Sequence, residues 1–182
     1  RISLSNNDSG TSNTIFGKTA GDPDGAGDLN VFIGELAGGT GTQTDNADSN
    51  VGVGYRALTD LTSGANNSSV GKDSGTNLTS GSMNAILGVD ALYTSTDVDK
   101  CIAIGKNAMY AGNATSDADG TIAIGYDAGR AIISSVGSIA IGYEALNVED
   151  DGDYSTAVGY QALKAQTGTS GEVANTAVGY QS

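Results

Sequence analysis

The residues with the most obvious potential for chemistry are acidic, and they cluster in short polar segments. Adjacent carboxylates such as Asp150 and Asp151 could share the two acidic roles of glycoside hydrolysis. The Asp-rich segments 22–28, 115–119 and 149–153 carry the oxygen ligands that Ca²⁺ prefers. None of them matches the spacing of an EF-hand loop, and adjacent acids in a turn mostly face solvent. We therefore expect solvated turns, with no metal site and no catalytic residue.

Nucleophilic catalysis lacks its usual base. The chain has no histidine and one cysteine, Cys101. Without an imidazole, a Ser-His-Asp or Cys-His arrangement cannot be assembled. A single cysteine also forms neither an intrachain disulfide nor a cysteine-rich metal site. The sequence therefore predicts a protein that is not an enzyme and that uses no cofactor.

The charge balance excludes two classes of partner. Acidic residues outnumber basic ones 21 to 8, which gives a formal net charge of -13. Nucleic acids and anionic lipids bind through clusters of Lys and Arg, and this chain lacks such clusters. No apolar run approaches the roughly 20 residues that a membrane-spanning helix needs. We expect no nucleic-acid partner and no membrane contact within this segment.

Tyrosine is the residue type whose spacing favours binding. Five of the eight tyrosines directly follow a recurring glycine, and four of these lie in consecutive copies of a repeat: Tyr126, Tyr143, Tyr160 and Tyr180. Equivalent residues on successive strands would form a ladder of rings about 4.8 Å apart. Such a ladder could stack on the sugar rings of a receptor, or it could pack against its own coil or a neighbouring subunit. The four tyrosines are the candidate receptor-facing residues.

A repeated unit positions these residues. Its glycines are spaced by 17 residues, or by 20 where three residues are inserted. A fixed period with whole-loop insertions predicts a solenoid of stacked coils. We expect the glycines to be structural turn residues. They are Gly17, Gly34, Gly54, Gly71, Gly88, Gly105, Gly125, Gly142, Gly159 and Gly179.

The three residues before each glycine read as a β-strand. The residue just before the glycine is always large and apolar, and the residue two positions earlier is mostly β-branched. We expect these two positions to form the inward-facing core. Small residues between them would let another backbone approach closely, so the position between them is the candidate subunit interface. In the later copies it holds Ala103, Ala123, Ala140, Ala157 and Ala177.

The rest of each unit is polar and rich in Gly, Asn, Asp and Ser, which indicates turns. Seventeen residues suit two short strands and two turns. Residues 1–182 therefore form one all-β repeat domain of about ten coils of 17–20 residues. One thin solenoid would bury little and expose strand edges at both ends. We expect an oligomer, and we interpret the chain as a fragment of a longer fibre.

The segments Gly120-Thr121-Ile122-Ala123-Ile124-Gly125 and Gly137-Ser138-Ile139-Ala140-Ile141-Gly142 resemble the repeat of YadA-type heads in trimeric adhesins. Residues 156–163 are also similar to repeats in phage tail fibres and bacterial surface fibres. The resemblance implies a left-handed parallel β-roll, assembled as a homotrimer, with the β-branched positions inside and the alanines near the trimer contact. The period here is longer and tyrosine often follows the glycine, so no ligand residue is transferred.

These observations predict the head or shaft of a trimeric extracellular attachment fibre, on a phage virion or a bacterial surface. Three copies would display weak contacts to a surface glycan or protein receptor, and avidity would supply the affinity. The alternative is a passive spacer, with recognition carried by another domain. An ice-binding solenoid is disfavoured, because the first strand position mixes Thr with Ile and Val instead of forming an unbroken Thr array.

Overall fold

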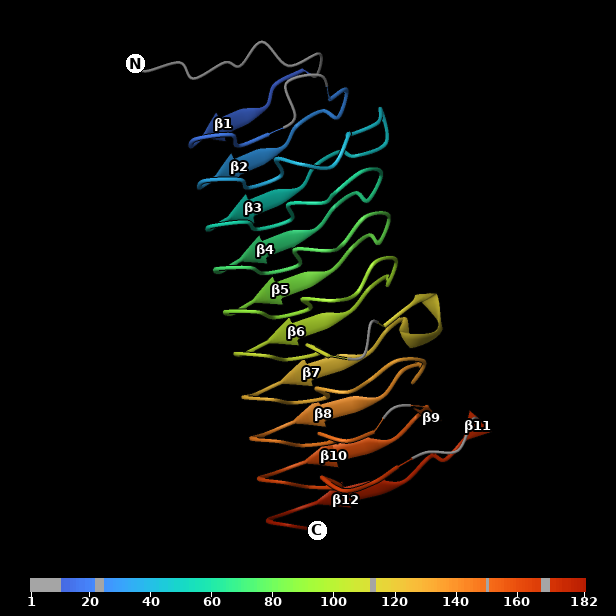
Figure 1. Ribbon diagram of the computed structural model, residues 1–182. Coiled ribbons are helices and arrows are strands. Elements are labelled where there is room, and N and C mark those ends of the chain that lie inside the picture. The colour runs from blue at the N-terminus through green and yellow to red at the C-terminus, as the bar shows by residue number, and fades with distance from the viewer. Residues whose placement is uncertain (1–10, 22–24, 112–113, 150, 168–170) are drawn as a thin grey trace.

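A computed structural model places ten three-residue strands in one parallel sheet, stacked in chain order (Figure 1). It describes residues 11–21, 25–111, 114–149, 151–167 and 171–182, with only the backbone of residues 171 and 172. The strands are β1 (Thr14–Phe16), β2 (Val31–Ile33), β3 (Val51–Val53), β4 (Ser68–Val70), β5 (Ala85–Leu87), β6 (Ile102–Ile104), β7 (Ile122–Ile124), β8 (Ile139–Ile141), β10 (Thr156–Val158) and β12 (Thr176–Val178).

The ten strands bound nine turns of a parallel β-solenoid, which confirms the predicted all-β repeat fold. Equivalent positions of neighbouring units pair directly, as in Ala140 with Ala157 and Ala157 with Ala177. The 17- and 20-residue turns give the same pairing, because the extra residues lie in loops at one side of the stack. Those loops carry the short 3₁₀ helix η1 (Ser116–Ala118) and the strand β11 (Gly171–Glu172), which pairs with β9 (Gly152–Asp153) (Figure 1).

The expectation of two strands in every coil is wrong. Within the described residues only β9 and β11 add strands outside the main sheet. Most of each coil is made of turns, because the backbone enters the left-handed region three times per coil. In the ninth coil these residues are Tyr154 (φ 59°), Gln161 (φ 55°) and Leu163 (φ 46°). Left-handed residues interrupt strand geometry and fold the chain back on itself within 17 residues.

The recurring glycines form the corner at the end of each strand. Their φ values lie between 127° and 146°, a region that favours glycine. The amide of Gly142 donates to the carbonyl of Ile124 in the preceding coil, at 2.8 Å. A Cβ on Gly142 would overlap the carbonyl group of Gly159 in the next coil. We call these ten stacked residues the glycine column. Both the backbone conformation and the spacing of the coils require glycine at the first nine, and the backbone conformation alone favours it at Gly179.

The two faces of the strands are reversed relative to the sequence-based prediction. The middle residue of each strand points into the roll, and Ala103, Ala123, Ala140 and Ala157 are fully buried within one chain. In the last coil Ala177 is half-buried. These alanines therefore line the interior of the solenoid and cannot form a subunit interface. The large apolar residues before the glycines, predicted to be the core, point outward instead.

The reason lies in the narrow interior of the roll, where a bulky residue of the strand needs a small residue on the opposite wall or in a neighbouring coil, as Ile86 has in Gly75. Phe32 fills this space in the second coil, and a Cβ on the facing Gly38 would lie 2.7 Å from its ring. In the eighth coil the sizes are exchanged: the strand residue is the small Ala140, and the residue at the position equivalent to Gly38 is the buried Leu146. Interiors are packed to near-crystalline density. Two β-branched residues per strand would overfill this interior.

Ala140→Leu is expected to lower the free energy of unfolding by about 1–3 kcal/mol, because the added atoms overpack the roll against Leu146. Chemical denaturation followed by circular dichroism measures the change. Ala165→Leu, at an exposed position, is the matched control and should change stability little. Equal stability of Ala140→Leu and the native protein would contradict the inward placement of this residue.

A ladder of buried amides ties the first coils together. Asn67 donates its backbone N–H to Asn50 Oδ1 at 3.0 Å and its Nδ2 to the carbonyl of Gly81 at 2.8 Å. Its Oδ1 accepts the N–H of Asn84 at 3.0 Å. Buried backbone groups need such partners. We call the five equivalent residues the asparagine ladder: Asn13, Asn30, Asn50, Asn67 and Asn84.

Asn67→Ala is expected to lower the free energy of unfolding by about 2 kcal/mol or more, because it leaves the Asn84 amide and the Gly81 carbonyl buried without partners. Asn46→Ala, at an exposed position, should change the denaturation midpoint little. Asn67→Ser should lower the free energy of unfolding less than Asn67→Ala does, because buried serines, Ser138 and Ser155, occupy this position in later coils. Similar stability of the two Asn67 variants would argue against the hydrogen-bond explanation.

Candidate functional site

The four tyrosines that follow the last four glycines form one continuous stack of rings. The Tyr143 ring lies 5.1 Å, centroid to centroid, from both Tyr126 and Tyr160. The Tyr180 ring lies 5.2 Å from Tyr160. Neighbouring ring planes differ by at most 10°. Paired positions in successive coils bring these residues together, and we call the four of them the tyrosine ladder.

Stacking determines which part of each ring meets solvent. The side chains of Tyr126, Tyr143 and Tyr160 remain 41–42% exposed, and Tyr180 is 72% exposed. Tyr143 and Tyr160 each have another ring on both faces. Their exposed parts are therefore the ring edge and the hydroxyl group. A sugar cannot stack on the face of either inner ring.

A polar column runs beside the ladder. Glu144 Oε2 accepts hydrogen bonds from Gln161 Nε2 at 2.6 Å and from Lys164 Nζ at 2.5 Å. Gln181 Nε2 donates to Gln161 Oε1 at 2.8 Å. The hydrogen bonds from Lys164 and Gln161 lower the pKa of Glu144. The charge of Glu144, with some burial, raises the pKa of Tyr143, so its phenol stays protonated at neutral pH.

The fifth tyrosine of this column is isolated. Tyr55 lies between Glu35 and Lys72 of the neighbouring coils and has no ring beside it. The guanidinium carbon of Arg56 lies 5.5 Å from its ring centroid instead, which is within cation–π range. The fold thus accepts charged residues as readily as tyrosine in this column.

The outer side of the main sheet is a broad apolar surface. Phe16 is 59% exposed, Leu87 50% and Val178 70%, and most other aliphatic side chains there are half-buried. Exposed apolar patches of this extent mark interaction surfaces. We call this surface the sheet face. It consists of the first and third residues of the ten main strands: Thr14, Phe16, Val31, Ile33, Val51, Val53, Ser68, Val70, Ala85, Leu87, Ile102, Ile104, Ile122, Ile124, Ile139, Ile141, Thr156, Val158, Thr176 and Val178.

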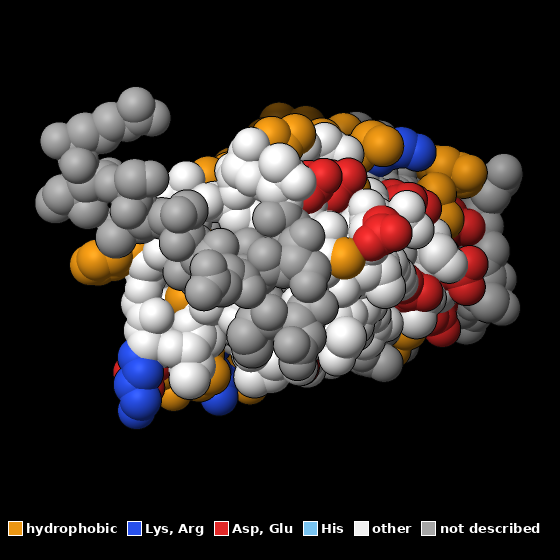
Figure 2. All heavy atoms as spheres, turned by 90° about the horizontal axis from the view of Figure 1, so that it is seen from above, with side chains coloured by type: hydrophobic (Ala, Val, Ile, Leu, Met, Phe, Trp, Pro, Cys, Tyr) orange, Lys and Arg blue, Asp and Glu red, His pale blue; other side chains and the backbone are white. Residues whose placement is uncertain are grey.

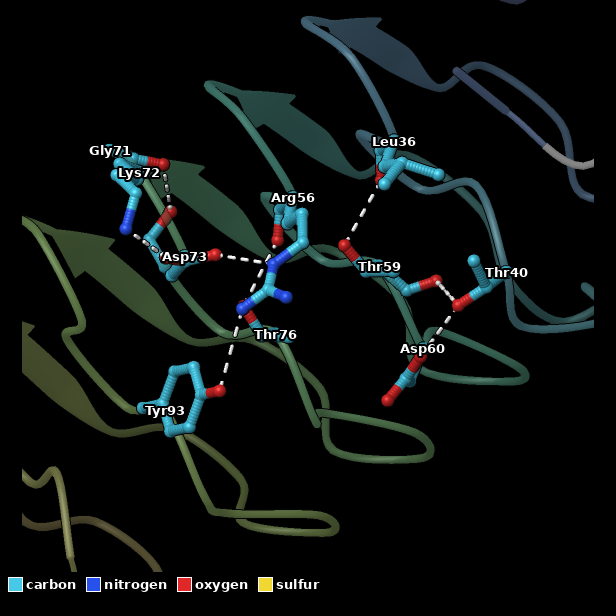
Figure 3. Close-up of polar contacts among 11 residues, drawn as sticks. Leu36, Thr40, Arg56, Thr59, Asp60, Gly71, Lys72, Asp73, Thr76 and Tyr93 are labelled. Carbon is cyan, nitrogen blue, oxygen red and sulfur yellow. Dashed lines mark hydrogen bonds and ion pairs between the residues drawn. The ribbon is translucent and has the colours of Figure 1, made fainter. Parts of the chain in front are cut away.

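A charged cluster on the turn side connects three coils (Figure 3). Asp73 is bound by Arg56 Nε at 2.6 Å and by Lys72 Nζ at 2.5 Å. Burial raises the pKa of Asp73, but the hydrogen bonds from Lys72 and Arg56 outweigh burial and hold the pKa below its ordinary value. Arg56 also reaches the hydroxyl of Tyr93, two coils on, at 3.4 Å. The cluster fastens coils to one another, and both cations pair with Asp73.

Sequence reasoning missed a second aromatic pair beside this cluster. The rings of Tyr93 and Tyr110 stack with centroids 5.3 Å apart, and the guanidinium carbon of Arg130 lies 5.6 Å from the Tyr110 centroid. All three lie five positions after their glycines. Comparing that position between coils would have found the pair.

The acidic segments act mainly as connectors between coils. Carboxylates cap backbone amides of the preceding coil, as in Asp28 N–H to Asp48 Oδ1 and Asp99 N–H to Asp119 Oδ1, both 2.7 Å. Acidic side chains gather on the side of the stack that carries η1 and β11 (Figure 2). Among the described residues, no three His, Cys, Asp or Glu side chains form a metal-binding group. Segment 22–28 is described only from residue 25.

The expectation that segment 149–153 is a solvated turn needs correction. Glu149 is fully buried, accepts the Gly152 N–H at 2.7 Å and binds Gln166 Nε2 in the next coil. Asp151 accepts from Ser134 Oγ at 2.7 Å. Asp150, the neighbouring acid weighed with Asp151 as a carboxylate pair, lies outside the described residues.

Cys101 is buried at the position that Asn occupies in earlier coils. Its amide donates to Asn84 Oδ1 at 2.9 Å, and its Sγ donates to the carbonyl of Ala118 at 3.4 Å. Burial raises the thiol pKa to about 11. The thiolate that reacts as a nucleophile is therefore disfavoured, and the residue continues the buried ladder.

Comparison with family models finds a match to part of the chain. The family model of the YadA head domain repeat matches two stretches, residues 112–128 and 151–163. No curated protein and no solved structure matches the chain. In the part of the chain that the structure describes, no helix has the length and apolar character that a membrane crossing requires.

Proposed function

We propose that this chain is a segment of a trimeric extracellular attachment fibre with no catalytic activity. The chain carries YadA-like head repeats. Three left-handed β-rolls pack their sheet faces together around a common axis. The fibre stands on a bacterial surface or a phage virion and holds receptor contacts at several points at once.

The sheet face is the observation that carries this proposal. It presents the mainly apolar outer side of ten strands to solvent, with Phe16 and Leu87 at least half exposed. A monomer with such a surface would associate indefinitely. A closed rotational arrangement covers the same patch on every copy and then stops growing. The YadA head repeats favour three copies over two.

The solution mass tests the assembly. Sedimentation equilibrium is expected to give the mass of three chains, unchanged over a hundredfold range of protein concentration. A stable monomer or dimer would refute the arrangement. The sheet face would then need another partner.

A passive spacer is the second candidate. It is favoured by the regular pairing of all ten strands, which makes a stiff rod irrespective of any ligand. Binding of the purified trimer to an array of glycans and of host surface proteins separates the two functions. A trimer that binds none of these is a spacer.

A further inference from the structure

The fold does not require the tyrosine ladder. In the six earlier coils the same position holds Lys18, Glu35, Tyr55, Lys72, Val89 and Lys106. Those coils stack with the same strand pairing as the last four. Four consecutive tyrosines are therefore a local property of the C-terminal coils.

The charged residues of this column also place it outside the proposed trimer contact. Lys18 and Glu35 pair at 3.5 Å, with side chains 80% and 48% exposed. Burying such groups against a neighbouring subunit would remove them from water, at a cost that exposed pairs do not repay. Since the column is continuous along the stack, the ladder faces solvent as these residues do.

The chemistry of the ladder selects a polar and uncharged ligand. It presents ring edges and phenol hydroxyls, flanked by the amides of Gln161 and Gln181 and by the carboxylate of Glu144. Lys164, the nearby cation, is held by Glu144. Hydroxyl groups match these donors and acceptors. Anionic ligands are repelled by the net charge of -13.

The spacing of the ladder selects a ligand with a matching repeat. Contacts at every ring, 5.1–5.2 Å apart, require a chain that advances by one unit per coil. An extended peptide repeats a given face only every 6.8 Å or so, and falls out of step after one ring. An extended β-1,4-linked glycan advances by about one coil height per sugar, and because successive sugars face opposite ways, the same face recurs in step with every second coil. It also carries hydroxyl groups along both edges.

We propose that the tyrosine ladder binds a neutral, extended β-1,4-linked glycan that lies parallel to the rod, with one sugar per coil. The ring edges and hydroxyls of Tyr126, Tyr143, Tyr160 and Tyr180 make the contacts, and the glutamine column adds hydrogen bonds. The proposal rests on the attachment function above and names its ligand class.

Calorimetric titration of the native protein with cellohexaose tests the ligand. Maltohexaose, which has the same sugar in a curved α-1,4-linked chain, is the linkage control, and an oligogalacturonate is the charge control. Cellohexaose is expected to bind and the two controls are not. A native protein that does not bind cellohexaose, or binds maltohexaose equally well, would overturn the proposal.

The double variant Tyr143→Phe/Tyr160→Phe keeps the stack and removes two hydroxyls. It is expected to weaken cellohexaose binding by at least about tenfold. Tyr55→Phe removes the isolated hydroxyl of the same column and should bind normally. Unchanged affinity of the double variant would show that the ladder is not the site.

Tyr143→Lys/Tyr160→Lys introduces the residue type found in this column at Lys72 and Lys106. It should abolish glycan binding and leave the trimer mass unchanged. Loss of the trimer would place the ladder at a subunit contact and overturn the proposal. A trimer that binds other receptors but not cellohexaose would keep the attachment function and refute only the ligand. A monomer would refute the attachment assembly itself.

Discussion

Gly142→Ala is expected to lower the free energy of unfolding by about 4 kcal/mol or more, a loss that few single substitutions produce. The alanine Cβ would lie 2.6 Å from the carbonyl carbon of Gly159 and closer still to its oxygen. The neighbouring atoms belong to the backbone of the next coil, so no side chain can move aside. The φ of 134° adds strain for any residue with a Cβ.

Gly120→Ala is the matched control. Gly120 also has a positive φ, 74°, but a Cβ there meets no atom within 4 Å. The Gly120→Ala substitution is expected to lower the free energy of unfolding by the conformational strain alone, about 1 kcal/mol. Denaturation by guanidinium chloride compares the two variants. Equal losses would show that conformation, and not the stacking of the glycine column, makes glycine necessary at position 142.

Ile141→Asp is expected to dissociate the proposed trimer. Ile141 lies on the sheet face and points away from the roll. In the trimer the substitution places a carboxylate from each chain in an apolar contact, and an unpaired buried charge costs several kcal/mol. The residue is outside the roll, so the strand pairing of each chain should survive. Sedimentation velocity is expected to give the monomer mass.

Ile133→Asp is the control, because Ile133 is 42% exposed but belongs to a turn outside the sheet face. It should leave the trimer intact. Ile141→Ala covers the case in which the charged chain fails to fold alone. It should give a folded protein whose trimer dissociates on dilution. A trimer that resists both Ile141 substitutions would show that the sheet face is not the contact.

The two predictions concern neighbouring residues, Gly142 in the corner after β8 and Ile141 on the outer side of β8, and they separate folding from assembly. Substitutions in the glycine column or at inward positions such as Ala140 are expected to reduce the stability of the coil itself. Substitutions on the sheet face are expected to change the mass and leave the coil folded. The reversal of the two faces makes this separation possible, because the interior is formed within one chain.

The sequence alone determined the architecture. In a stacked fold, equivalent residues of successive coils meet directly. The 17-residue spacing of Gly125, Gly142 and Gly159 is therefore enough to predict the strand pairing. It also located every strand of the main sheet and brought the tyrosines of the last four coils into one column. Local periodicity sufficed for these features because each coil contacts only its neighbours.

Only the tertiary structure decided which side of each strand faces inward. An alternation with a period of two is the same for both faces. The choice depends on what the opposite wall of the roll provides, such as Gly38 opposite Phe32 and Leu146 opposite Ala140. For the tyrosine ladder, the sequence repeat predicts the spacing, and the tertiary structure decides how the rings pack. That its inner rings cover one another and leave ring edges and hydroxyls exposed follows from their packing.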